Sequence, residues 1–446
     1  MQTWCNERIK CTLQDRQFNL TTTISATRLT IQGSGTRLLL DRSLMHHRLF
    51  FDATELAGFD KGTGIQRVTR ALLQALRQNP PADWKVVAVR GNGTTGRFIT
   101  ATSLAEHQLT VHQQSPDEIA IEPVEGDIFL SVDLAYNITP LLRRELVRFR
   151  SHGVCVYFVI YDLIPLMYPE WFEGTNAWFE GNDYLKLFNY WFECVSEEGD
   201  GLVCISDAVR KDTEAWLARH QPKRADFPQL GYFHLGSDIT ESVPSSGLPT
   251  NATDVLSRLK SSTTFLMVGT LEPRKGHELA LNATEILWAQ GKDVTLVFVG
   301  RAGWKIEQLI GRLENHPCLG TQLFWLDGIS DEYLREVYSA SSALLALSSS
   351  EGFGLPLVEA AHFRLPLIVR NIPVFREICG EAATYFNGSS SDELQVLLSK
   401  WLKERDTGKC IYPDNMEVLS WPDSARQLMS VVGKMQGNEF FWNDKK

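Results

Sequence analysis

Apolar residues recur along this chain with two alternating periods, and the changes of period predict the order of its structural elements. Short apolar runs typical of strands are separated by segments in which apolar residues recur every three or four positions, as on one face of a helix. In the first part of the chain the predicted strands are HRLFFDA, WKVVAVR, DIFLSVD, VCVYFVIYD and LVCIS. The expected helices are GIQRVTRALLQAL, LRRELVRFR, a helical region over 174–198 and a segment from Asp207.

The alternation then stops and restarts. Residues 237–262 are rich in Ser, Thr, Gly and Pro, which is the composition of a linker, with a short helix expected near Val255–Lys260. Beyond it the predicted strands are TFLMVG, VTLVFVG, QLFWLDG, ALLALS, LPLIV and ATYFN. The helices that alternate with them are expected over 276–290, 303–315, 331–341, 356–363, 374–379 and 391–404, with a last one at SARQLMSVVGKM.

Strands that alternate with helices on both sides of a linker predict an α/β protein with two doubly wound, parallel-sheet domains of the Rossmann type. Ligands of such sheets bind beyond the carboxyl ends of the strands, so we expect a cleft between strand-to-helix loops of the two domains. The expected division is an extension of uncertain structure (1–46), a first domain (47–236), the linker (237–262), a second domain (263–420) and a C-terminal helix with its tail (421–446).

Composition narrows the classes of function. The 446-residue chain has 43% hydrophobic and 22% charged residues, enough to bury large cores, and its formal net charge of −10 argues against nucleic acid as a partner. Its eight cysteines form no C-x-x-C pair and no zinc-type cluster with histidine, and Cys155 and Cys204 stand within apolar runs. Such thiols are typical of a reducing compartment, so a cytoplasmic protein is expected. The chain has no run of eighteen apolar residues, and MQTWCNERIK has no apolar core of a signal peptide.

The most informative loop is SSSEGFGLPLVEA, which follows the predicted strand ALLALS. Glu351 and Glu359 stand eight positions apart, so the first lies in the loop and the second lies inside the helix that begins near Pro356. Carboxylates only accept hydrogen bonds, which suits them to the paired hydroxyls of a ribose or a sugar. The helix dipole alone would explain Glu359 but not Glu351. The glycines let a ligand approach the backbone, and amides there can point at an anion. The residues that would do so are Gly352, Phe353, Gly354 and Leu355.

A second loop, GTLEPRKGH, places the adjacent cations Arg274 and Lys275 at a predicted helix start. Cations oppose the helix dipole at that end, so a bound diphosphate would explain them, and a solvated helix end is the alternative. Gly269 and Thr270 stand where this loop leaves its strand.

Two loops of the first domain have weaker signals. DKGTGIQ places Gly62 and Gly64 before a helix, which suits a phosphate at the helix N-terminus or a tight turn that needs glycine for itself. Asp162, at the end of VCVYFVIYD, can face the cleft or cap the turn that follows. The chain has no D-x-D, G-x-S-x-G or P-loop motif, so no bound metal is expected and the hydrolase and P-loop classes are disfavoured.

The motifs taken together resemble those of the retaining GT-B glycosyltransferases of family 4, and most of all bacterial mannosyltransferases of surface-polysaccharide assembly. The resemblance covers about residues 47–435. It implies the GT-B fold, in which two Rossmann-like domains face each other across a cleft and the last helix crosses back to the first domain. The motifs that carry it are GIQRVTRALL, YDLIPLMYPEWF, CISDAVRKD, LGSD, VGTLEPRKGHELAL, EGFGLPLVEA and SWPDSARQLM.

The resemblance also implies roles for the loop residues of the second domain. Glu359 would hold the ribose of a nucleotide-sugar donor, Glu351 would contact the transferred sugar, and Lys275 would bind the diphosphate. Many relatives have arginine directly after the glycine that corresponds to Gly269. Here that residue is Thr270, and we expect Arg274 to supply the charge.

In the first domain, Gly62 and Gly64 match the family's glycine loop near the diphosphate. Many relatives have His-Asp where this chain has Tyr161-Asp162, so a histidine that contacts the transferred sugar is replaced by a tyrosine, which offers a hydroxyl.

The implied reaction is transfer of a hexose, expected to be α-mannose from GDP-mannose, to a growing glycan or lipid-linked oligosaccharide in O-antigen, capsule or exopolysaccharide biosynthesis. The configuration would be retained by front-face substitution, without metal or other cofactor. The implied partners are the nucleotide sugar and the glycan acceptor, with peripheral contact to the inner face of the cytoplasmic membrane or to other polysaccharide-assembly enzymes.

Several alternatives stay open. The donor sugar can be rhamnose, glucose or another hexose, and a non-hydrolysing sugar-nucleotide epimerase shares the two-domain fold but would need an acid/base pair that no loop offers. An inactive scaffold is a third reading, in which Thr270 and Tyr161 are signs of decay. The aromatic-rich segment 171–192 suits a core helix, an acceptor groove or a bilayer-docking surface, and the arginines of LRRELVRFR suit a solvated face or a lipid-phosphate patch.

Overall fold

The computed structural model describes residues 47–104, 119–175, 181–220, 223–224, 226–239 and 245–442, together with the backbone of three strands nearer the N-terminus. The chain forms two units, Met1–His47 and Arg48–Lys446. In the first unit three strands form an antiparallel sheet in the order β1-β2-β3. These strands are β1 (Thr23–Ser25), β2 (Arg28–Gly33) and β3 (Thr36–Leu39).

The second unit contains two sheets, and the one nearer the N-terminus defines what we call the N-terminal half. Its seven strands follow the order β10-β9-β8-β7-β4-β5-β6. The strands from β10 to β4 pair in parallel, and β5 and β6 form an antiparallel edge pair that the pattern of apolar residues does not predict. The strands are β4 (His47–Asp52), β5 (Trp84–Asn92), β6 (Arg97–Thr100), β7 (Ile128–Ser131), β8 (Cys155–Ile160), β9 (Gly201–Cys204) and β10 (Gln229–Tyr232). The helices are α1 (Thr54–Gly58), α2 (Gly64–Gln78), α3 (Arg143–Ser151), α4 (Ile164–Met167), α5 (Tyr184–Glu198) and α6 (Asp207–His220).

The other sheet defines the C-terminal half, and it is parallel throughout, in the order β13-β12-β11-β14-β15-β16. Each strand predicted there is found, because strands buried on both faces read as continuous apolar runs. The strands are β11 (Thr263–Val268), β12 (Val294–Val299), β13 (Leu323–Leu326), β14 (Ala343–Ala346), β15 (Leu367–Arg370) and β16 (Thr384–Phe386). The helices are α7 (Ala252–Ser261), α8 (His277–Ala289), α9 (Glu307–Glu314), α10 (Asp331–Ala340), α11 (Leu355–His362), α12 (Pro373–Cys379) and α13 (Ser391–Asp406).

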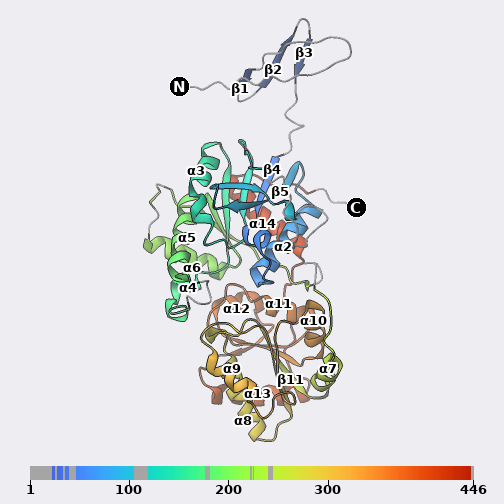
Figure 1. Ribbon diagram of the computed structural model, residues 1–446. Helices are drawn as coiled ribbons and strands as arrows, with labels where there is room; N and C mark the ends of the chain where they lie inside the picture. The colour runs from blue at the N-terminus through green and yellow to red at the C-terminus, as the bar shows by residue number, and fades with distance from the viewer. Residues whose placement is uncertain are drawn as a thin grey trace. The chain divides into compact units, whose positions relative to one another are not determined.

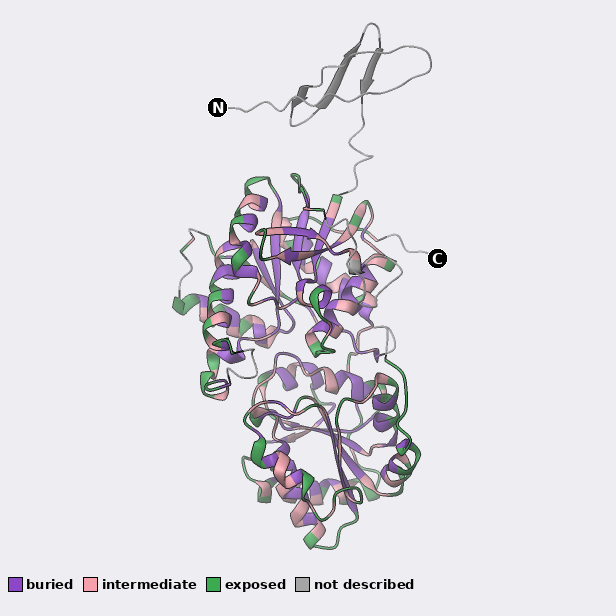
Figure 2. Cartoon of the chain, in the orientation of Figure 1, coloured by how far each residue is buried: buried purple, intermediate pink, exposed green. Residues whose placement is uncertain are grey.

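Both halves have the strand order of a doubly wound Rossmann sheet. Figure 1 shows the helices arranged around each sheet, and Figure 2 shows buried residues along the strands and exposed residues on the outer helix faces. In the C-terminal half the strand order reverses between β11 and β14, which is where such sheets bind ligands. The loops that follow these two strands hold Lys275 and Glu351.

The last helix, α14 (Trp421–Gln436), returns to the N-terminal half, as the resemblance implies. The Ser424 hydroxyl donates to the His234 carbonyl over 2.7 Å, and the Gln229 side chain donates to the Met435 carbonyl over 2.8 Å. Gly231 in β10 leaves room for this helix, because a Cβ there would overlap the Val431 side chain. Figure 1 shows α14 in red among the N-terminal elements.

Candidate donor site at the strand ends of the C-terminal half

The loop after β11 turns sharply before α8 begins. Pro273–Lys275 forms a single 3-10 turn, and Gly276 has a left-handed φ of 79°. A Cβ at this glycine would lie 2.9 Å from the Leu347 carbonyl oxygen, in the loop after β14. The glycine therefore brings the two loops of the switch point together and places Lys275 beside Glu351.

The charged groups of these loops form one cluster. The Lys275 ammonium contacts Glu351 Oε1, and Arg274 Nη1 lies 3.2 Å from Glu351 Oε2. Arg274 also pairs with Glu272 over 2.8 Å and donates to the Ser350 carbonyl over 2.7 Å. Two cations thus face two carboxylates, and all four side chains are largely buried, with at most 17% exposed. Buried charges need such pairing.

The cluster fixes the protonation of Glu351. Burial raises the pKa of this carboxyl, but Lys275 and Arg274 lower it more, to about 2. Burial dominates at Glu272, whose pKa is raised although Arg274 opposes the change. Burial lowers the pKa of Arg274, but the neighbouring carboxylates of Glu351 and Glu272 together raise it by more, so the pKa is raised overall. Glu351 is therefore an ionised hydrogen-bond acceptor near neutral pH.

A small pocket opens beside this cluster. Lys275, His277, Ser348 and Glu351 supply its polar groups, and the rest of its wall is mostly apolar. Burial lowers the pKa of His277 to about 3, and its Nδ1 has no hydrogen-bond partner among the described residues. The pocket thus combines a neutral imidazole with the ion pair. Its other lining residues are Met267, Val268, Leu345, Ala346, Leu347, Gly354, Pro356, Leu357 and Phe375.

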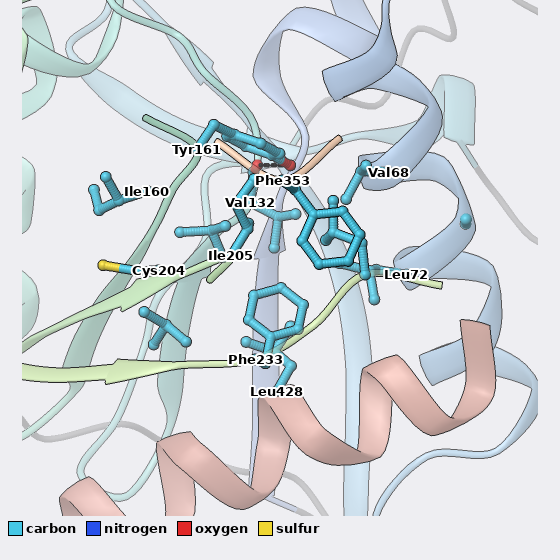
Figure 3. Close-up of a cluster of buried hydrophobic side chains, with 14 of the residues drawn as sticks. Val68, Leu72, Val132, Ile160, Tyr161, Cys204, Ile205, Phe233, Phe353 and Leu428 are labelled. Atoms are coloured by element: carbon cyan, nitrogen blue, oxygen red, sulfur yellow. Dashed lines mark hydrogen bonds between the residues drawn. The ribbon is translucent and has the colours of Figure 1, made fainter. Parts of the chain in front are cut away.

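The glycine-rich loop after β14 docks onto the N-terminal half. A Cβ at Gly352 would overlap the Tyr161 carbonyl oxygen, and the Ser206 hydroxyl donates to the Gly352 carbonyl over 2.7 Å. The Phe353 side chain is only 3% exposed. Figure 3 shows its ring among apolar side chains of the N-terminal half, Phe233 and Leu72 included, in a buried cluster that also extends into the C-terminal half. The sequence predicted that some group would approach the backbone of this loop closely. The groups that do so here are the Tyr161 carbonyl and the Ser206 hydroxyl.

Two further loop residues set the start of α11. Gly354 has a left-handed φ of 95° and precedes the helix, and a Cβ there would lie 2.9 Å from both Leu357 and Phe375. Leu355 is the first helical residue and is half-buried. That backbone amides at 353–355 hold an anion remains a prediction.

Glu359, inside α11, contacts the N-terminal half through an arginine that the sequence reasoning missed. Arg67 Nη1 donates to Glu359 Oε1 over 2.8 Å, and the Tyr338 hydroxyl donates to Oε2 over 2.7 Å. Arg67 Nη2 also donates to Asp331 over 2.6 Å. Both oxygens of the carboxylate predicted to hold a ribose are thus oriented by protein donors. The sequence marks Arg67 only by its position three residues after Gly64 in the glycine loop, which does not identify Glu359 as its partner.

The glycine loop before α2 forms the turn that caps this helix. It also lies near Leu355 of the C-terminal half. Thr63 and Gln66 form a capping box, and the Asp60 carboxylate accepts a hydrogen bond from the Gly62 amide over 2.9 Å. Gly62 and Gly64 are exposed, and a Cβ at Gly64 would lie 3.9 Å from the Leu355 side chain. The turn explains the glycines in part, and the phosphate role stays a prediction.

Asp162, at the end of β8, caps the turn that follows and also lies near the charged cluster of the C-terminal loops. Asp162 accepts a hydrogen bond from the Ile164 amide over 3.0 Å, as expected for a turn cap. Burial raises the pKa of Asp162, and the nearby Arg274 opposes this effect. The Tyr161 hydroxyl donates to the Val132 carbonyl over 2.9 Å inside the core (Figure 3). It therefore does not offer this hydroxyl to a sugar in the observed conformation.

The loop after β11 begins with Gly269 and Thr270. A Cβ at Gly269 would lie at an ordinary contact distance of 3.8 Å from the Lys275 ammonium, so it is the φ of 139° that requires a glycine here. Thr270 is exposed. Arg274, expected to replace the family's arginine, directs its charge at Glu351 and Glu272.

Two weaker sequence signals prove to be structural. Of the aromatic residues in 171–192, those that are buried confirm core packing, while Trp178 and Phe179 lie outside the described residues. The buried ones are Phe172, Tyr184, Phe188, Trp191 and Phe192. Three of the four arginines of α3 pair with acids, which disfavours a lipid-phosphate patch, and the fourth, Arg144, is exposed. Arg143 binds Glu198 over 2.8 Å, Arg148 binds Glu145 over 2.8 Å, and Arg150 binds Asp200 over 3.0 Å.

Comparison with known proteins defines the class of this fold and site. Residues 253–413 match the family model of the Glycosyl transferases group 1. Sucrose-phosphate synthase from Thermosynechococcus elongatus superposes with a TM-score of 0.59 at 16% identity, over 88% of this chain and 99% of that one. Anabaena HepE in complex with UDP and glucose gives 0.53 at 16% identity, over 88% and 98% of the two chains. These likenesses show the fold, and the expected GT-B architecture is confirmed.

The names of the curated relatives specify the sugar that these relatives transfer, which the comparison of folds does not. The serotype-specific mannosyltransferase WbdA of Escherichia coli is 39% identical over 390 residues, which cover 86% of this chain and 44% of the relative. The O-antigen chain mannosyltransferase RfbU of Salmonella typhimurium is 31% identical over 140 residues, 31% of this chain and 38% of the relative. The chain thus resembles bacterial mannosyltransferases, one of them named for the O-antigen chain, and spans less than half the length of these two.

No described helix is both long and apolar enough to cross a membrane. Within the same residues, no three His, Cys, Asp or Glu side chains gather as a metal site would require.

Proposed function

We propose that this chain is a retaining mannosyltransferase that moves α-mannose from GDP-mannose to a growing glycan or lipid-linked oligosaccharide of a bacterial surface polysaccharide, such as an O-antigen. The observation that carries the proposal is the cluster of Lys275, Arg274 and Glu351 at the switch point of the C-terminal sheet. Its support for mannose is the 39% identity to a serotype-specific mannosyltransferase over 86% of the chain.

In the proposed reaction the donor diphosphate binds Lys275 and Arg274, which stabilise the charge that develops on the leaving phosphate. The bond between the sugar C1 and the phosphate oxygen breaks, and a bond from C1 to the acceptor hydroxyl forms on the same face. The acceptor proton passes to the departing phosphate oxygen. Glu351, whose pKa is about 2 while Lys275 and Arg274 pair with it, accepts hydrogen bonds from the transferred sugar.

The two cations would neutralise the diphosphate, so transfer is proposed to need no metal or other cofactor. The reaction is placed in the cytoplasm, with a lipid-linked acceptor presented at the inner face of the membrane. The paired arginines of α3 are not part of this proposal.

The test has two stages. A thermal-shift titration with GDP, UDP and dTDP, each beside its common sugar conjugates and without metal, should show selective stabilisation by GDP and GDP-mannose. Transfer of labelled mannose to a lipid-linked acceptor should then proceed in wild type and cease in Glu351→Ala with the fold retained. Stabilisation by another nucleotide would change the donor and keep the mechanism. If no nucleotide stabilises the protein, the inactive-scaffold reading replaces this proposal.

A further inference from the structure

Arg67 joins the two halves at the carboxylate proposed to bind ribose. It leaves α2 in the N-terminal half and bonds Glu359 in α11 and Asp331 in α10 over 2.8 and 2.6 Å. Asp331 is itself fixed, since it accepts hydrogen bonds from the Ser245 amide and hydroxyl, both over 2.9 Å. The guanidinium is therefore held on two sides and cannot rotate freely.

The bonding capacity of this group is only partly used. Arg67 has five N–H donors, and among the described residues its hydrogen bonds engage one on Nη1 and one on Nη2. Glu359 can accept about four hydrogen bonds and accepts one on each oxygen. Unused N–H donors of Arg67 thus lie next to unused acceptor positions of Glu359. A hydroxyl group can satisfy both, because it both donates and accepts hydrogen bonds.

The charge balance distinguishes a hydroxyl from a phosphate. One guanidinium lies between two carboxylates, Glu359 and Asp331, so the group carries a net negative charge. A diphosphate would be repelled here more than at the cluster in the other loop, where two cations and two carboxylates leave no net negative charge. A neutral diol is the better ligand for Arg67.

We propose that Arg67 binds the ribose hydroxyls of the donor nucleotide together with Glu359, so that recognition of the nucleotide requires a residue from each half. The inference rests on the proposed function, which assigns Glu359 to the ribose. It adds a donor-binding residue from the N-terminal half.

The test compares GDP with 2′,3′-dideoxy-GDP by isothermal titration calorimetry on the full chain. Wild type should bind GDP at least about tenfold more tightly than the dideoxy nucleotide. Arg67→Gln should weaken GDP by about tenfold and leave dideoxy-GDP within about twofold, because the two changes remove the same interaction. The matched control is Arg97→Gln. Arg97 likewise pairs with two acids, the buried Glu145 and the exposed Glu122, but both lie in the N-terminal half, and its loss should change neither affinity.

The outcomes separate the ideas. Equal weakening of both nucleotides by Arg67→Gln would show that Arg67 acts on contact between the halves, and would overturn the ribose assignment. Unchanged affinities would overturn it as well. If wild type binds none of GDP, UDP and dTDP, the proposed function fails with it. Should Arg67→Gln not fold by circular dichroism, Arg67→Lys provides the same comparison, with an intermediate loss for GDP only.

Discussion

Replacement of Phe353 by alanine tests how the glycine-rich loop is held. The ring is 3% exposed and packs among apolar side chains of the N-terminal half, although its backbone belongs to the C-terminal half (Figure 3). Removing a buried phenylalanine ring costs about 3–5 kcal/mol. Because the ring crosses between the halves, we expect that cost to act on their association. At about 1.4 kcal/mol per tenfold, 3 kcal/mol lowers the ratio of docked to separated halves by roughly a hundredfold.

The assay combines urea unfolding, small-angle X-ray scattering and nucleotide titration. The matched control is Phe265→Ala, since Phe265 is 0% exposed and packs against Trp401 within the core of the C-terminal half alone. Both variants should unfold at lower urea. Only Phe353→Ala should increase the radius of gyration and weaken nucleotide binding. The reasoning is refuted if Phe353→Ala keeps the wild-type radius and affinity, or if Phe265→Ala loses both to the same extent.

Two further predictions concern the same loop. Gly352→Ala should reduce kcat/KM for transfer by more than about tenfold. Its Cβ would overlap the Tyr161 carbonyl oxygen and so displace the loop that holds Glu351. The control Gly311→Ala, on an open helix surface, should leave the rate unchanged. The Glu351 carboxyl, with a pKa of about 2 in the fold and 4.5 as its ordinary value, stabilises the protein fully above pH 4.5 and loses this effect as the pH falls toward 2. Between pH 5.5 and 3 the unfolding free energy of wild type should fall by about 2 kcal/mol more than that of Glu351→Gln in urea titrations, and parallel curves would contradict the assignment.

The fold was predictable where strands are buried on both faces. The six strands of the C-terminal half appear as apolar runs, and their alternation with helices gives the parallel sheet. The edge strands β6 and β10 were not predicted, because RFIT and QLGY are short and partly exposed and so have no apolar run. The five-residue helix α1 is too short to show a helical period.

The site was predictable only in part, for a physical reason. Lys275 and Glu351 stand in loops whose position follows from the strand pattern, and the structure brings them into contact. Arg67 lies 292 residues from Glu359, so no local pattern marks it as the partner. For Gly352, the sequence indicates that something approaches the backbone. It cannot distinguish a ligand from the Tyr161 carbonyl, because both would exclude a side chain.

The paired acids bear on how a donor would enter this site. Glu351 is bound by Lys275 and Arg274, and Glu359 by Arg67, as buried carboxylates require. Under the proposed function a diphosphate must therefore take Lys275 and Arg274 from Glu351 instead of meeting unpaired cations. That exchange would leave Glu351 with acceptor capacity at the moment the sugar arrives, and its buried charge would then be satisfied by sugar hydroxyls. Diphosphate binding and sugar recognition would thus be one event, and a sugar without its diphosphate should bind poorly.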